Sequence, residues 1–216
     1  MQELLASYQR LLAAADAWFA RCQQVLGEQV RCTAGCTGCC RGLFDITLLD
    51  ALALQQAFDR LPEGQRKAVA ARADLQIAAL QQRWPTFGPP YLLNDLPHRQ
   101  WETPLSDETP CSLLGPDGVC LVYAGRPLTC RLHGLPQVDH TGEIFDEEGC
   151  TLNLPAADPL RRPELRGEFR PLFAEEARLL RQLAARLGRP GGEIDTYIPT
   201  ALFIDFRRPP LNIHWS

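Results

Sequence analysis

The chain has 216 residues, of which 45% are hydrophobic and 22% are charged, and its formal net charge is −4. This length suits one domain over 1–216 and is enough to bury a core without staples. The composition is close to the globular average, which argues against a collagen-like, coiled-coil or globally disordered chain. The acidic balance argues against a nucleic-acid partner, because phosphate binding needs a clustered cationic surface.

The first segment shows no targeting or membrane-spanning pattern. The first residues include the acidic Glu3 and do not form the cationic start of a signal peptide. Asp16 and Arg21 interrupt the first apolar stretch before it reaches the length of a membrane span. We therefore expect a cytoplasmic protein with no membrane partner. Because cytosolic thiols are kept reduced, nine cysteines in that compartment favour metal binding over disulfides.

Hydrophobic periodicity predicts helices in the first part of the chain. Apolar residues at three- and four-residue spacing predict a helix over 3–26. The segment 32–42 is rich in cysteine and glycine and has no apolar period, which predicts a tight loop. Thr47 is a suitable N-cap for a helix over 47–60, and a further helix is predicted over 62–83.

The rest of the chain alternates irregular and periodic segments. Between 84 and 136 lie nine of the 18 prolines, which predicts irregular structure. Within it, 112–114 and 119–122 flank a Gly-Pro-Asp-Gly turn and predict a short β-hairpin. A last long helix is predicted over about 163–187, and the apolar tail 197–206 fits either helix or strand. The expected fold class is mainly α: a helical bundle with an irregular, proline-rich, metal-stapled loop region and a short hairpin.

Eight cysteines form the pattern that carries chemistry. They are Cys32, Cys36, Cys39, Cys40, Cys111, Cys120, Cys130 and Cys150. A tight loop can turn several thiolates toward one centre, and zinc and iron–sulfur clusters favour shells made entirely of thiolates. We therefore predict that all eight are metal ligands. Cys22 lies on the apolar face of 3–26 and is expected to be a core residue, as free cysteine often is.

The adjacent pair Cys39-Cys40 restricts the kind of site. Neighbouring side chains diverge, so one mononuclear tetrahedral ion would not easily accept both sulfurs. The pair favours either a polynuclear cluster or two neighbouring sites that share the loop. Two sets of four ligands, or one set of four and a reduced remainder, are both compatible with the pattern, and disulfides or buried thiols are the alternatives to metal.

These residues resemble the YkgJ-type cysteine cluster family, described as zinc- or iron-chelating. The resemblance rests on Cys-x3-Cys-x2-Cys-Cys over 32–40, Pro110-Cys111, Gly-Val-Cys-Leu-Val-Tyr over 118–123 and Arg-Pro-Leu-Thr-Cys-Arg over 126–131. It implies a zinc or iron–sulfur site built by both cysteine segments, within a core of about 32–150. The commonest family form has two residues, not three, between the first two cysteines.

More remotely, the chain is similar to the cluster domain of flagellin lysine methylases. That similarity implies a 4Fe–4S cluster and S-adenosylmethionine, with methyl transfer as the weaker implication. Cys32, Cys36 and Cys39 also have the Cys-x3-Cys-x2-Cys spacing of radical S-adenosylmethionine enzymes. The chain is too short for the barrel of about 250 residues that the spacing normally accompanies.

Three residues beside the later cysteines are candidate cofactor-binding residues. Arg126 and Arg131 flank Cys130 and could offset the negative charge of a thiolate-bound cluster, or they could be a solvent-exposed pair. Tyr123 is expected to pack the hairpin against the loop, with its hydroxyl available to a sulfur or a carbonyl.

The leading functional hypothesis is a metal-binding protein that holds an iron–sulfur cluster or zinc. One alternative is a cluster-dependent enzyme, such as a methyltransferase using S-adenosylmethionine, which needs an open pocket beside the cluster. The other is a structural zinc module whose helices contact protein partners.

Overall fold

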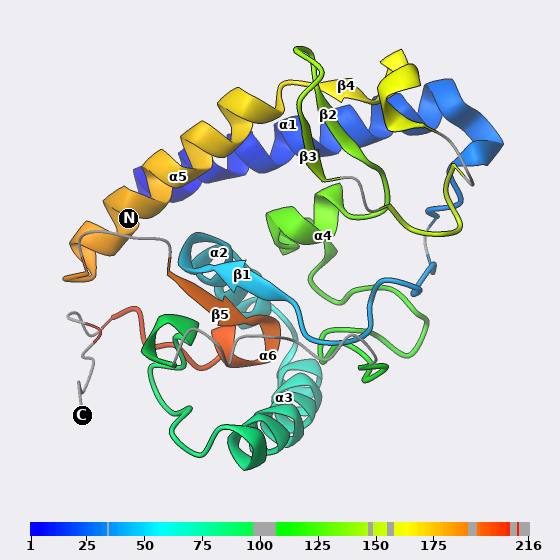
Figure 1. Cartoon of the computed structure of the whole chain (residues 1–216). Coiled ribbons are helices and arrows are strands. Elements are labelled where there is room, and N and C mark those ends of the chain that lie inside the picture. The colour runs from blue at the N-terminus through cyan, green and yellow to red at the C-terminus, as the bar shows by residue number, and fades with distance from the viewer. Residues whose placement is uncertain are drawn as a thin grey trace. The chain divides into compact units, whose positions relative to one another are not determined.

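The computed structural model describes residues 1–33, 35–96, 107–146, 149–154, 158–189, 194–207 and 211. These residues are mainly α-helical with a few short strands, which confirms the mainly α class, while the metal-stapled loop stays a prediction (Figure 1). They divide into two compact units: Met1–Cys39 with Leu128–Leu179, and Cys40–Pro127 with Leu180–Ser216. The single domain over 1–216 stays a prediction. Within the described ranges no helix is long and apolar enough to cross a membrane.

The first unit is built on two helices that lie side by side (Figure 1). Its helical elements are α1 (Gln2–Leu26), the 3-10 turns η1 (Gly27–Gln29), η5 (Pro159–Arg161) and η6 (Pro163–Leu165), α4 (Leu128–Leu132) and the first part of α5 (Phe169–Arg186). The Trp18 ring meets the Phe169 ring edge-on at 4.9 Å, and its Nε1 donates to the Leu165 carbonyl at 3.0 Å. The apolar face predicted for 3–26 is thus the face that packs this unit.

The last long helix begins later than predicted. Pro163–Leu165 forms η6, and Arg166–Gly167 (β4) pairs in parallel with β2 (Gln137–Asp139), which also pairs with β3 (Ile144–Asp146) in antiparallel fashion. A Cβ on Gly167 would lie 2.7 Å from the Phe169 ring, so only glycine lets the strand pass there without displacing a side chain. Strand pairing and tight packing at this glycine therefore prevent the helix from beginning before Phe169, although the apolar periodicity starts earlier.

The second unit contains the central helices and a two-stranded sheet (Figure 1). Its elements are β1 (Asp45–Thr47), α2 (Leu48–Asp59), α3 (Glu63–Arg83), η2 (Leu93–Asp95), η4 (Tyr123–Gly125), β5 (Asp195–Tyr197), α6 (Ile198–Ala201) and the end of α5. β1 and β5 are antiparallel, with Ile46 opposite Thr196. Thr47 caps α2 by accepting from the Asp50 N–H at 3.2 Å, as predicted.

Aromatic packing holds this second unit together. Trp84 and Tyr197 stack with ring centres 6.1 Å apart and planes 6° apart, and Phe87 meets Tyr197 edge-on at 6.2 Å. Tyr197 is fully buried. The tail, which the sequence left open between helix and strand, uses both, because β5 continues directly into α6.

The expected hairpin around residue 116 is present only as a tight turn. Leu114 and Cys120 form an isolated antiparallel bridge, and the Leu121 N–H donates to the Leu113 carbonyl at 2.9 Å. The chain then enters η4 instead of continuing as a strand. Two glycine-containing turns so close together leave no length for a β-ladder.

Candidate metal centre

The first group of cysteines lies in the first unit and is organised by Asn153. The Asn153 side chain accepts from the Arg31 N–H at 2.7 Å and donates to the Gly134 carbonyl at 2.7 Å. Its Nδ2 also lies 3.2 Å from the sulfur of Cys32. Since the Asn153 N–H in turn donates to the Cys150 carbonyl at 2.8 Å, one buried amide ties the Cys32 loop to the Cys150 turn.

Four thiols of this unit interact electrostatically. Burial is the main cause that raises the pKa of Cys32, and the thiols of Cys36, Cys150 and Cys39 raise it further. The hydrogen bond from Asn153 acts in the opposite direction, because it favours the thiolate. The thiols of residues 36, 39 and 150 are therefore near enough to act on the Cys32 sulfur when charged.

Gly134 makes room for this arrangement. Its φ is 113°, a conformation that other residues rarely adopt, and a Cβ there would lie 3.3 Å from both the Cys32 sulfur and the Asn153 amide nitrogen. The backbone thus passes directly beside the sulfur. Neither Gly134 nor Asn153 was among the predicted site residues, although a Gly and an Asn near cysteines are ordinary signals of a turn.

The second group of cysteines is brought together by backbone pairing in the second unit. The Cys111 N–H donates to the Cys40 carbonyl at 2.9 Å, and Arg41 and Pro110 form an antiparallel bridge beside it. The turn that follows returns Cys120 toward Cys111, and the like charge of Cys120 is one cause that raises the pKa of the Cys111 thiol.

Backbone N–H groups point at both sulfurs of this turn. The N–H of Leu113 bonds the Cys111 sulfur and the N–H of Val122 bonds the Cys120 sulfur, each two residues after its cysteine. Burial raises the pKa of Cys111 to about 11 and also raises that of Cys120, while these N–H bonds lower both. Without a cation these half-buried thiols stay protonated at neutral pH, and the N–H donors are already in place for thiolates.

Arg126 and Tyr123 lie beside Cys120. The guanidinium of Arg126 is 3.7 Å from the centre of the Tyr123 ring, and its charge lowers the pKa of Cys120. Tyr123 is exposed, so its ring supports the arginine on the surface and does not pack into a core. The predicted role of Arg126 toward a cluster stays a prediction, and the sulfur on which its charge acts is that of Cys120.

Cys130 and Arg131 lie on α4 in the first unit. Cys130 is half-buried. The guanidinium of Arg131 is buried and forms an ion pair with Asp16 of α1. The predicted role of Arg131 toward a cluster stays a prediction, and the geometry gives its charge a carboxylate partner.

Cys22 is the core residue that the sequence predicts. It is fully buried, and its sulfur donates to the Glu164 carbonyl at 3.3 Å. Among the residues that the structure describes, no three Cys, His, Asp or Glu side chains form a preassembled metal-binding group. All nine cysteines are free thiols, so the disulfide alternative has no pair in the structure.

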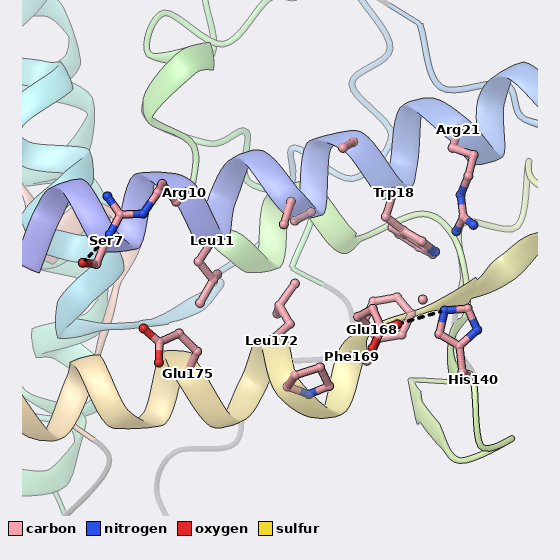
Figure 2. A pocket seen from close by; sticks show the side chains of 15 residues that line it. Ser7, Arg10, Leu11, Trp18, Arg21, His140, Glu168, Phe169, Leu172 and Glu175 are labelled. Atoms are coloured by element: carbon pink, nitrogen blue, oxygen red, sulfur yellow. Dashed lines mark hydrogen bonds and ion pairs between the residues drawn. The ribbon is translucent and has the colours of Figure 1, made fainter.

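A groove of about 610 Å³ lies between α1 and α5 in the first unit (Figure 2). Leu11 and Leu172 point toward each other across it, and Trp18 and Phe169 line the end near His140. Its volume is within the range of small-ligand sites. The described lining residues include no cysteine, so this groove does not supply the pocket beside a cluster that the enzyme alternative requires.

Thiols are side chains that suit a soft metal, and their role as ligands in this chain stays a prediction. Cys32, Cys36, Cys39 and Cys150 are the candidate ligands in the first unit, and Cys111 and Cys120 are those in the second, where Cys40 joins them through its backbone carbonyl. Side-chain and backbone N–H donors to the sulfurs are the outer contacts that orient ligands and tune such centres. The repulsion and burial that disfavour thiolates here are the two costs that a bound cation removes.

Comparison with known proteins gives no relative from which to transfer a function. No family model, no curated protein and no solved structure matches the chain. The resemblance to the YkgJ-type family therefore stays a prediction that rests on the cysteine motifs alone.

Proposed function

We propose that this protein binds metal, either as an iron–sulfur cluster or as zinc, through its clustered cysteines. The observation that carries the proposal is the neighbourhood of Cys32. Its half-buried sulfur has an amide donor from Asn153 at 3.2 Å and interacts with the thiols of Cys36, Cys39 and Cys150.

Packing alone does not explain such a neighbourhood. A cysteine that only fills space behaves as a small hydrophobe and needs no donor, as Cys22 shows by donating its own hydrogen to a carbonyl. Cys32, Cys111 and Cys120 instead accept N–H groups, which is what thiolates require. Metal binding would release the protons of these thiols, and the free energy of metal binding would add to the stability of the fold.

The decisive experiment is purification under strict exclusion of oxygen, followed by metal and sulfide analysis. An iron–sulfur protein will contain iron and sulfide in equal amounts, absorb visible light and give an electron paramagnetic spectrum after reduction. Tight zinc in fixed proportion, without colour, would instead identify a zinc protein and favour the structural module. A folded, colourless chain with neither metal would refute the proposal.

Serine variants assign the ligands. The double variant C32S/C150S is expected to lose the metal of the first unit, and C111S/C120S that of the second, because serine is a poor ligand for soft metals. Cys22→Ser is the matched control, since it removes a buried thiol but keeps a donor to Glu164. Equal metal content in the two double variants and in Cys22→Ser would show that the cysteine groups are not the ligands. The variant Cys130→Ser then reports whether Cys130 is a ligand.

The enzyme alternative has its own test. Calorimetric titration of metal-loaded protein with S-adenosylmethionine should show no binding if the cysteines form only closed ligand shells. Saturable binding at one site per chain would make the cluster-dependent methyltransferase the better proposal.

A further inference from the structure

Arg72 of α3 hydrogen-bonds the backbone that directly follows Cys111. Its Nε and Nη2 both donate to the Ser112 carbonyl, at 3.0 and 2.7 Å, and Nη2 also donates to the Leu114 carbonyl at 3.3 Å. The carbonyls of two alternate residues just after the cysteine therefore converge on one guanidinium. The planar fork of arginine provides these donors in one rigid group, which an ammonium does not.

Gln76 completes the contact from the same helix. It lies one turn after Arg72, so both side chains project from one face of α3. The Gln76 amide donates to the Pro110 carbonyl at 2.9 Å. Together the two side chains grip residues 110–114, which we name the Cys111 loop, on both sides of its cysteine.

An exposed arginine on a helix ordinarily faces solvent, and that role does not account for these contacts. Arg72 is largely exposed, yet it makes three hydrogen bonds to one distant loop. The contact therefore fixes the backbone that follows one candidate ligand.

We propose that Arg72 is a positioning residue for the metal at Cys111 and Cys120, and that Gln76 assists it by fixing the start of the loop. The inference rests on the proposed function for the metal. The helix α3 would act as the rigid support that keeps the two sulfurs and their N–H donors in ligand geometry before metal arrives.

Three variants separate the parts of this role. Arg72→Gln removes both fork and charge, and Arg72→Lys keeps the charge but loses the fork. Lys67→Gln is the matched control, because it removes one positive charge from the same helix. Lys67 is exposed and pairs with Glu63 at 2.6 Å. Circular dichroism confirms that each variant keeps its helices.

The first measurement needs no metal. Hydrogen exchange of the peptide 110–122 in reduced, metal-free protein should be faster in Arg72→Gln and Arg72→Lys, and unchanged in Lys67→Gln. The second is the rate at which a chelator withdraws metal from the loaded protein. We expect Arg72→Gln to release metal about 10–100-fold faster than the wild type, as for loss of other outer contacts of metal ligands. If the metal-release rate of Arg72→Lys lies between the rates of wild type and Arg72→Gln, the positive charge contributes as well as the fork.

The outcomes distinguish this inference from the proposal on which it rests. Wild-type protein that never holds metal would refute the proposed function, whatever the exchange data show. Wild-type protein that holds metal, with exchange and release in Arg72→Gln within about twofold of Lys67→Gln, would overturn the role of Arg72 alone.

Discussion

Replacing Asn153 by alanine tests the contact that organises the first cysteine group. The substitution removes two short N–H···O bonds, with Arg31 and Gly134, and the donor to the Cys32 sulfur. Each neutral bond contributes about 1 kcal/mol net, and the lost donor to the Cys32 sulfur adds up to about 1 kcal/mol more, while the Gly134 carbonyl keeps the Cys150 N–H at 3.3 Å. We expect the free energy of unfolding of the metal-free, reduced protein to fall by about 2–3 kcal/mol.

Urea denaturation under reducing conditions measures this loss. The midpoint should fall while the slope stays constant, because the surface exposed on unfolding does not change. Asn94→Ala is the control in the other unit, where the side chain accepts from the Asp195 N–H at 2.9 Å, and it should cost about 1 kcal/mol. Asn153→Asp should also bind metal more weakly than wild type, because it replaces a donor to sulfur by a carboxylate. A loss below about 0.5 kcal/mol for Asn153→Ala would show that the amide does not organise the group.

Three further predictions concern the scaffold. Gly125→Ala should destabilise by about 1–3 kcal/mol, because its Cβ would lie 2.4 Å from that of Ala57, and adding Ala57→Gly should restore part of the loss in urea denaturation. Asp139→Ala should destabilise at neutral pH, because bonds from the Arg170 and Thr141 N–H groups hold the carboxyl pKa below its usual range. That difference should disappear as pH falls through the folded pKa, and equal stabilities at pH 7 would contradict it. Burial raises the pKa of Tyr197 from 10.0 to about 12. The contribution of its protonated hydroxyl to the free energy of unfolding is therefore complete below pH 10 and is lost as pH rises toward 12. A Tyr197→Phe variant, followed by thermal melts from pH 9 to 12, should lack that alkaline loss.

The predicted helices agree with the structure wherever a local signal decides the end of the element. Gly27 ends α1 with φ of 53°, and Thr47 caps α2 by its side chain. Such ends depend on residues within one turn, which the sequence displays directly. The late start of α5 depends instead on β4 pairing with β2, a partner whose own strand no local pattern announced.

The candidate site divides in the same way. Cysteine spacing identifies the ligand types, because thiolate chemistry belongs to the residue itself. The supporting residues are not marked by spacing. Asn153 is 121 positions from Cys32, and Arg72 is 40 positions from Ser112. Only the folded backbone shows that these polar side chains end beside a sulfur or its loop.

The adjacent residues Cys39 and Cys40 belong to different units of the structure. Divergence of neighbouring side chains left two options open, one polynuclear cluster or two sites that share the loop. In the structure Cys39 acts on Cys32 within the first unit, while the Cys40 carbonyl bonds the Cys111 N–H within the second. The boundary between the units falls between these two residues. Each residue of the pair thus interacts with a cysteine of its own unit. We expect two ligand groups, so metal analysis of the two double serine variants should find that each loses only part of the total.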